Sequence, residues 1–322
     1  MTPEPNLLAS AIYNFFVHLT EFHFRGSIAS WINKAKLYVA KKYPGPVATR
    51  IHGYRVVVNF GYAYPFFSRM FSFYNNPLVE LVNQAFQAND KKPVTVIDVG
   101  AAIGDTVLLV ESNCPEMVKR YLCIDGDAEF YTFLNRNLGS MEKVKTFLAL
   151  LSESEGSEKE LIRTHLGTAS AQGKGSVQSI SLDNLLSNDL EQGIDVLKID
   201  VDGFDGKVLK GSRRILKECK PAVIFEWHPI LCEQTGNNWS DHFEVLEECG
   251  YSQYVWFTKF GEFSHFTYGF QKDVTEKLAQ ISSRNLHCYD WHYDVVALHP
   301  DSGISELALA ELRFAKARKS RY

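Results

Sequence analysis

Apolar residues near the N-terminus recur at the spacing of one helical face. The first apolar stripe consists of Leu8, Ile12, Phe15, Phe16 and Leu19. A second stripe follows the break at Arg25-Gly26 and consists of Ile28, Trp31, Ile32, Ala35 and Val39. Because this spacing is typical of amphipathic helices, we predict two helices within residues 5–42. The lysines of the second helix lie largely off its stripe, so the helix either packs on its own domain or lies on a membrane surface.

From residue 92 onward the pattern changes to short apolar runs that alternate with helical segments. The runs predict strands at 94–99, 121–124, 146–151, 194–199, 221–225, 251–257 and 294–298. Helical patterns lie between them, the clearest at 128–138, 205–219 and 241–249. This alternation predicts an α/β domain with a mostly parallel sheet covered by helices on both faces. Ligands of such sheets bind at the carboxyl ends of the strands.

Charge is unevenly distributed along the 322 residues, although the net charge is only −4. Residues 1–50 hold six basic and two acidic residues, and the last ten hold five basic residues and no acid. The acidic remainder argues against nucleic acid as a partner. The basic ends are either solvated or in peripheral contact with an anionic membrane. The six scattered cysteines and the absence of a signal-like N-terminus lead us to expect a cytoplasmic protein.

The first candidate site is a glycine turn that follows a buried strand. Asp98 ends the run, and Gly100 and Gly104 then allow the backbone to approach a ligand closely. The spacing differs from the G-x-G-x-x-G of dinucleotide sites, which weighs against a dehydrogenase. The carboxylate of Asp98 would repel a pyrophosphate but suits a ligand with an ammonium group.

The second candidate is the acid at the end of the next strand. Asp125 is placed where an acid accepts hydrogen bonds from ribose hydroxyls in nucleotide-binding folds. It could instead form a turn. We expect Asp127 to cap the helix that begins at Ala128.

Two further candidates lie at the ends of the next two strands. Asp200 and Asp202 point the same way if their strand continues, although Asp202 could simply cap the following helix. The segment Glu226-Trp227-His228-Pro229 places a histidine beside the same cleft. His228 is a candidate general base, or else a hydrogen-bonded structural histidine.

Over roughly residues 92–230, these segments together resemble the FkbM family of S-adenosylmethionine-dependent methyltransferases. The shared pattern is a D-V-G-A-x-x-G turn, an acid ending strand two, the S-L-D-x-L segment at 181–185, a K-I-D-V-acid-G run and an acid-x-His that ends strand five. This chain has Ala102 where the family often has Asn, Asp125-Gly126 in place of Glu-Pro, and Asp202 and Asp205 in place of two glutamates. The resemblance implies a Rossmann-like class I methyltransferase fold with seven strands, one of them antiparallel near an edge. It also implies methyl transfer, commonly to oxygen.

The resemblance implies a role for each candidate residue. Cofactor-binding positions are Asp98, Gly100, Ala101 and Gly104 for the methionine part and its turn, Asp125 and Gly126 for the ribose, and Asp200 near the amino or sulfonium end. We expect His228 to be the base, with Asp202 and Glu226 orienting it or binding acceptor hydroxyls. We expect no metal, although residues His287, Cys288, Asp290, His292 and Asp294 gather near the last strand.

We divide the chain into an N-terminal helical and β-hairpin appendage (1–90), the methyltransferase domain (91–300) and a basic C-terminal helix or tail (301–322). Two aromatic-rich segments, 61–74 and 254–270, either line an acceptor pocket or pack in the core. Since aromatic rings pack on the C–H faces of sugars, our first hypothesis is a small-molecule or glycan acceptor with O-methylation of a carbohydrate or glycolipid. A polyketide hydroxyl and a non-catalytic glycan-binding module are the alternatives. The sequence predicts no oligomeric state.

Overall fold

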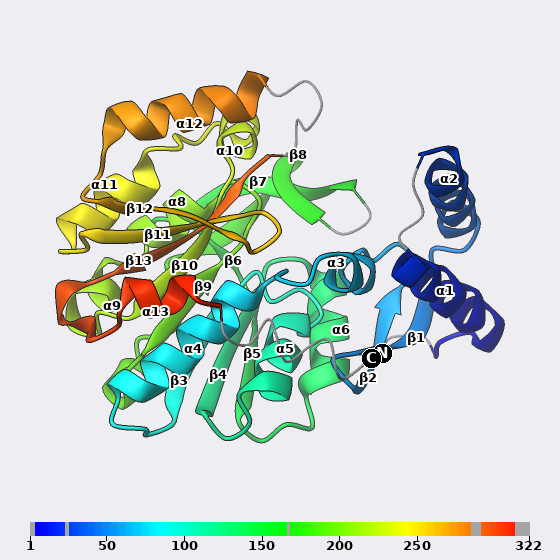
Figure 1. The fold of residues 1–322 in the computed structure, drawn as a ribbon, viewed down its shortest axis with the longest axis horizontal. Coiled ribbons are helices and arrows are strands. Elements are labelled where there is room, and N and C mark those ends of the chain that lie inside the picture. The colour runs from blue at the N-terminus through cyan, green and yellow to red at the C-terminus, as the bar shows by residue number, and fades with distance from the viewer. Residues whose placement is uncertain (1–3, 23–25, 166–167, 285–290, 313–322) are drawn as a thin grey trace.

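The computed structural model describes residues 4–22, 26–165, 168–284 and 291–312. Within these residues the main sheet has eight strands, in the order β12-β11-β13-β10-β9-β3-β4-β5 (Figure 1). Their bounds are β3 Val94–Val99, β4 Val118–Asp125, β5 Val144–Leu148, β9 Val196–Ile199, β10 Ala222–Trp227, β11 Gln253–Thr258, β12 Phe263–Tyr268 and β13 Tyr293–Leu298. Strands β5, β4, β3, β9 and β10 are parallel, which confirms the expected α/β fold.

The sheet differs from the expected seven strands at one edge. β13 runs antiparallel to both β10 and β11, as expected for one reversed strand, but β12 adds a second reversed strand beyond β11. The predicted strand at 251–257 corresponds to β11, whereas β12, the second strand of this hairpin, was not predicted. Its signal is Gly261, which adopts a left-handed φ of 82° between the two strands.

Helices cover both faces of the main sheet, as predicted. One face packs against α4 Asn76–Ala88, α5 Asp105–Asn113, α6 Ala128–Leu138 and α13 Glu306–Ala310. The other packs against α7 Leu182–Leu185, α8 Asp205–Lys210, α9 Arg213–Glu218, α11 Asp241–Glu248 and α12 Lys272–Arg284. Successive residues of β3 show the division, because Val96 enters the first core and Ile97 the second. Figure 1 shows α4 and α13 lying across the near face of the sheet.

The predicted helix at 205–219 is divided into α8 and α9. The division falls at Gly211, where an added Cβ would lie 2.2 Å from the carbonyl oxygen of Ser152. The chain therefore turns at Gly211 because another backbone segment approaches it. Short elements elsewhere are α10 Pro229–Thr235, η2 Leu190–Gln192 and η3 Pro300–Ser302.

A second, smaller sheet was not expected from the sequence. It contains β6 Leu150–Leu151, β7 Gly156–His165 and β8 Thr168–Ile180, with β8 in the middle. β7 and β8 form a long antiparallel hairpin whose mixed polar composition carries no clear apolar alternation.

The N-terminal part contains the two predicted helices and the predicted hairpin. Its elements are α1 Leu7–Leu19, η1 Thr20–Phe22, α2 Gly26–Lys42, β1 Pro46–Ile51, β2 Tyr54–Asn59 and α3 Tyr64–Met70. α1 buries Tyr13, Phe16 and Val17 against the rest of the protein. Of the two predicted apolar stripes, however, Leu8, Phe15, Ile28 and Trp31 remain exposed. Packing on the protein's own domain therefore accounts for only part of these stripes.

The basic tail at 313–322 lies outside the described residues. None of the helices among the residues that the structure does describe combines the length and the hydropathy needed to cross a bilayer.

Candidate active site

A cavity of about 1130 Å³ opens at the carboxyl ends of β3, β4, β9 and β10. It brings together seven of the ten predicted site residues: Gly100, Asp125, Gly126, Asp200, Asp202, Glu226 and His228. The other three, Asp98, Ala101 and Gly104, do not line it. The segments that meet here are far apart in the sequence and adjacent in the sheet, as expected for a strand-end site.

The turn after β3 is shaped by its two glycines. Gly100 and Gly104 have left-handed φ values of 75° and 90°, and a Cβ on Gly104 would lie 2.5 Å from Leu138 Cδ1. The backbone N–H groups of Gly100 and Ala101 donate to the carbonyl oxygen of Ile124, at 2.9 and 3.1 Å. Ala101 and Gly104 thus hold the turn in place, while Gly100 presents backbone to the cavity.

Asp98 lies beneath this turn and contacts a buried lysine. Lys198 Nζ is 2.9 Å from Asp98 Oδ1, 3.6 Å from Asp200 Oδ2 and 3.2 Å from the carbonyl oxygen of Gly100. The hydroxyl of Thr106 donates to the other Asp98 oxygen. Burial by itself lowers the pKa of Lys198, but the surrounding carboxylates outweigh it and the net shift is upward. Lys198 was not among the predicted site residues, and its signal in the sequence is a lone lysine inside an apolar strand.

Asp125 lines the cavity with a carboxylate that two backbone groups orient. Oδ2 accepts the N–H of Ala102 at 2.8 Å, and Oδ1 accepts the N–H of Asp127 at 2.8 Å. Burial raises the pKa of Asp125 to about 7, against the lowering effect of these hydrogen bonds. Asp127 caps α6 by accepting from the N–H groups of Glu129 and Phe130, which confirms the predicted cap.

The segment after β9 is a loop rather than a continued strand, because β9 ends at Ile199. Asp200 and Asp202 nevertheless both line the cavity. Asp202 has a left-handed φ of 50°. The N-cap of α8 is Phe204, so the alternative that Asp202 caps this helix is wrong. Asp205 organises the loop instead, since its carboxylate accepts the N–H groups of Val201 and Gly203.

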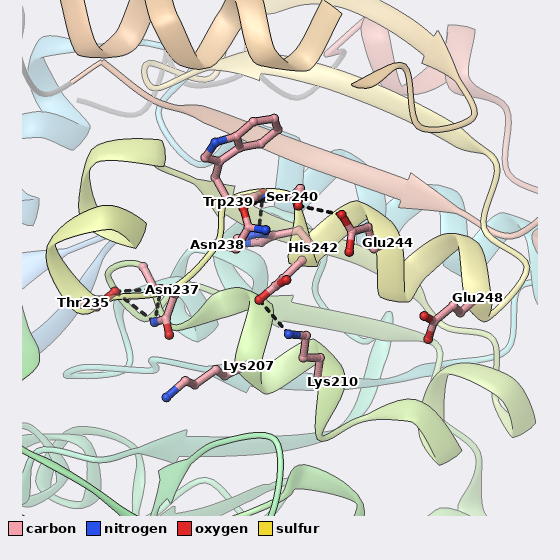
Figure 2. A network of polar contacts seen from close by, with 12 residues as sticks. Lys207, Lys210, Thr235, Asn237, Asn238, Trp239, Ser240, His242, Glu244 and Glu248 are labelled. Atoms are coloured by element: carbon pink, nitrogen blue, oxygen red, sulfur yellow. Dashed lines mark hydrogen bonds and ion pairs between the residues drawn. The ribbon is translucent and has the colours of Figure 1, made fainter. Parts of the chain in front are cut away.

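The same loop is held from outside by the end of α10 and the chain that follows it. The carbonyl oxygen of Gly203 accepts from Asn237 Nδ2 at 2.9 Å and from the hydroxyl of Thr235 at 3.3 Å. Figure 2 shows Thr235 and Asn237 side by side in this polar network. The network also includes the ion pair of Lys210 with Asp241, at 2.7 Å. The position of Asp202 is therefore fixed from two sides.

A histidine pair and a buried glutamate form the far wall of the cavity. His228 and His292 stack with ring centroids 5.1 Å apart, and His292 Nε2 lies 3.2 Å from Glu226 Oε1. Glu226 pairs across the sheet with Asp294. Burial and the neighbouring acids raise the pKa of Glu226 well above its ordinary value, and burial raises that of Asp294 to about 8. His228 Nδ1 accepts the N–H of Leu231 at 3.4 Å and caps α10, so the structural interpretation of this histidine is also supported.

Aromatic side chains from both predicted segments also line the cavity. They are Tyr62, Tyr64, Phe67 and Tyr74 from the first segment and Phe260 from the second. Phe71 and Phe260 stack with centroids 4.0 Å apart, so the two segments meet. Tyr254, Trp256 and Phe257 are core residues instead. Part of these segments therefore packs in the core and part lines the cavity, and binding of an acceptor by the latter stays a prediction.

The residues present fit S-adenosylmethionine. Asp125 offers oriented carboxylate oxygens for ribose hydroxyls, and the backbone of Gly100 lines the same cavity. Acidic Asp200 and basic Lys198 flank the place where an amino acid moiety would lie. Among the described residues no group of three or more His, Cys, Asp or Glu is arranged to hold a metal, while His287, Cys288 and Asp290 lie outside them.

Residues 98–252 match the family model described as the methyltransferase FkbM domain. The chain carries a methyltransferase FkbM domain. The match includes the glycine turn, Asp125, the Asp200–Asp205 loop and His228, and it supports S-adenosylmethionine as the cofactor of this FkbM domain. A search of curated proteins finds no match to the chain.

Among solved structures, the methyltransferase FkbM from Methylobacillus flagellatus KT is similar at 12% identity, with a TM-score of 0.39. The match covers 64% of this chain and 44% of that one, so this chain spans less than half of that protein. The M. jannaschii TYW2 structure in complex with AdoMet matches at 14% identity and a TM-score of 0.38, covering 78% and 84%. A SAM-dependent methyltransferase from Aquifex aeolicus matches at 12% and 0.34, covering 64% and 81%. At these identities and TM-scores, the solved structures assign no residue of this FkbM domain a role.

Proposed function

We propose that this chain transfers a methyl group from S-adenosylmethionine to a hydroxyl oxygen of a carbohydrate or glycolipid. The observation that supports this most is the convergence in one cavity of a ribose-type acid, Asp125, with the Glu226–His228 wall and an aromatic wall. Asp125 suits a cofactor, whereas the Glu226–His228 wall and the aromatic wall suit an acceptor.

The cofactor, when bound, supplies an electrophilic methyl group on a sulfonium. In this proposal Asp125 accepts hydrogen bonds from the ribose hydroxyls, and the backbone at Gly100 and Gly126 approaches the cofactor closely. Asp200, whose side chain is about half exposed, faces the amino or sulfonium end. Asp98 pairs with Lys198 and is proposed to act on the cofactor through this lysine. A direct contact between Asp98 and the cofactor stays a prediction. Positioning the acceptor in line with the methyl carbon supplies much of the rate.

The acceptor hydroxyl must lose a proton during transfer, and His228 is the proposed base. Its Nδ1 lies toward the N–H of Leu231, so Nε2 is the nitrogen that takes the proton. Nε2 accepts a proton only in the tautomer that carries hydrogen on Nδ1. In that tautomer Nδ1 no longer accepts the N–H of Leu231, so His228 acts as a base only when it gives up this 3.4 Å cap contact. A base of this kind contributes about 10²–10⁴-fold.

Glu226 and Asp202 are proposed to orient His228 or to bind other hydroxyls of the acceptor. A sugar ring offers several hydroxyls for these carboxyl groups and a C–H face for Tyr64, Phe67 and Phe260. We also propose a cytoplasmic location, in keeping with the free cysteines of the described residues.

The test is methyl transfer from labelled S-adenosylmethionine to a panel of sugars and lipid-linked sugars, with polyketide alcohols beside them. Incorporation into a sugar hydroxyl supports the proposal. Incorporation only into polyketide alcohols refutes the acceptor class and leaves the methyltransferase. Absence of S-adenosylhomocysteine binding, measured beside NAD by calorimetry, contradicts the proposal altogether.

A further inference from the structure

We propose that the outer surface of α1 and α2 binds an anionic lipid membrane. The two helices contact each other and project together at one end of the molecule (Figure 1). The two helices carry several large apolar side chains that are exposed: Leu7, Leu8, Phe15, Ile28, Trp31 and Tyr38. Soluble surfaces rarely expose so many large apolar groups together, and such patches mark interaction sites.

The outer face of α2, formed by Trp31, Lys34, Tyr38, Lys41 and Lys42, combines aromatic and basic groups. All five side chains are exposed, and their spacing places them on one side of the helix. The ammonium of Lys42 lies 5.9 Å from the ring centroid of Tyr38. Tryptophan and tyrosine favour the membrane–water interface, and lysines beside them attract anionic headgroups.

Charge complementarity selects an anionic surface as the partner. α2 carries four lysines and no acidic residue, while the chain as a whole has a net charge of −4. The exposed outer face of α1 adds Leu7, Leu8 and Phe15, which are 84%, 72% and 60% exposed and uncharged. A purely electrostatic contact would need no apolar groups, and a self-association face would not need uncompensated lysines. Both features together are those of an interfacial helix pair.

The opposite side of α2 faces the cavity. Lys36, Leu37 and Ala40 line the same cavity as Asp125 and His228. One helix therefore connects the proposed lipid-binding surface to the candidate active site. An acceptor carried on a lipid would enter beside α2, a consequence that rests on the proposed function.

The test is sedimentation of the full chain with vesicles of phosphatidylcholine, with and without phosphatidylserine, at low salt. We expect binding only to the anionic vesicles. Replacing Lys34, Lys41 and Lys42 by glutamine should weaken it at least tenfold, since each lysine near the surface contributes about fivefold. The pair Trp31→Ser and Tyr38→Ser should weaken it as well, because the interfacial aromatic groups are lost.

Matched controls lie on other parts of the surface. Lys217, Lys272 and Lys277 are exposed lysines away from α2, and Leu307 and Tyr268 are exposed apolar groups away from it. Replacing these by glutamine or serine should leave vesicle binding unchanged. Melting curves of all variants should coincide, because the altered side chains are exposed.

Several outcomes overturn the proposal. They are no binding to anionic vesicles, equal loss in the control variants, and dimerisation through α1 and α2 in the absence of lipid. The experiment uses neither cofactor nor acceptor. If the unmodified chain binds S-adenosylhomocysteine but no anionic vesicles, this surface is refuted and the methyltransferase proposal stands.

Discussion

The carbonyl oxygen of Asp200 occupies the place where a side chain on Gly100 would begin. A Cβ built on Gly100 lies 1.8 Å from that oxygen, far inside van der Waals contact. The turn after β3 and the loop after β9 therefore meet backbone to backbone at the centre of the site. This contact explains why a glycine is required at the first position of the turn.

We predict that Gly100→Ala disrupts this junction. Both the left-handed φ of 75° and the clash with Asp200 oppose the substitution. The matched control is Gly236→Ala, since Gly236 has the same φ of 75° but no atom within 4 Å of an added Cβ. We expect Gly100→Ala to cost about 1–3 kcal/mol more free energy of unfolding than Gly236→Ala, from overpacking. Denaturant titration measures the difference, and equal losses would contradict the contact.

Asp125→Ala should weaken S-adenosylhomocysteine binding at least tenfold, about 1.4 kcal/mol. The substitution removes both carboxylate oxygens that face the cavity side of β4. Isothermal calorimetry measures the dissociation constant. Asp189→Ala, which removes an acid paired with Arg120 away from the cavity, serves as control and should bind normally. Normal binding by Asp125→Ala would remove Asp125 from the cofactor site.

The affinity for S-adenosylhomocysteine should rise with pH near neutrality. Burial raises the pKa of Asp125 to about 7, and the ionised carboxylate is the better acceptor for ribose hydroxyls. We therefore expect affinity to increase by up to about tenfold between pH 6 and pH 8. Asp125→Asn, which cannot ionise, should lose most of this dependence. An unchanged profile in this variant would assign the titration to another group.

His228→Asn should separate the two roles of this histidine. Asparagine is a good N-cap, so it can replace the contact with the N–H of Leu231 and preserve stability, whereas alanine loses about 1 kcal/mol. Neither variant should change cofactor affinity by more than a few-fold, and both should slow methyl transfer strongly. The measurements are melting temperature, calorimetry and turnover of labelled cofactor. Turnover equal to that of the unmodified protein would remove His228 from the mechanism.

The cofactor-free protein should become less stable as pH rises from about 6.5 to 8. Burial raises the pKa values of Asp105, Asp125 and Asp205 to about 7 and of Asp294 to about 8. An unfolded aspartate has a pKa of about 3.9, so in this window the folded state still holds protons that the unfolded state has lost. Rising pH removes them and lowers the free energy of unfolding.

His242 acts in the opposite direction but at lower pH. Burial lowers its pKa to about 4, so its contribution to stability rises between about pH 4 and 6.5 and is then constant. Calorimetric melting at pH 6.5 and pH 8 therefore reports mainly on the carboxyl groups. Asp294→Asn should flatten the decline, and a melting temperature that rises across the window would refute the assignment.

Local sequence signals predicted the elements whose pattern is strong and continuous. The β-branched run of β3, the helix α6 with its Asp127 cap, and the hairpin of β1 and β2 all follow from spacing and capping. Strand β12 and the β7–β8 hairpin were missed, because their mixed residues have no simple period. Pairing with a neighbouring strand stabilises such segments, and a pairing partner is not visible along the chain.

The candidate site was likewise predictable from the sequence only in part. The sequence alone determined which strand ends carry Gly100, Asp125, Asp200 and His228, because an acid or glycine directly after an apolar run marks a strand end. Only the tertiary structure decided that Lys198 holds Asp98, that Asp205 rather than Asp202 organises its loop, and that His292 lies against Glu226. It also decided which apolar residues of α1 and α2 stay exposed. These contacts join groups distant in sequence, and burial, which sets their charges and pKa values, exists only once the sheet and its helices have assembled.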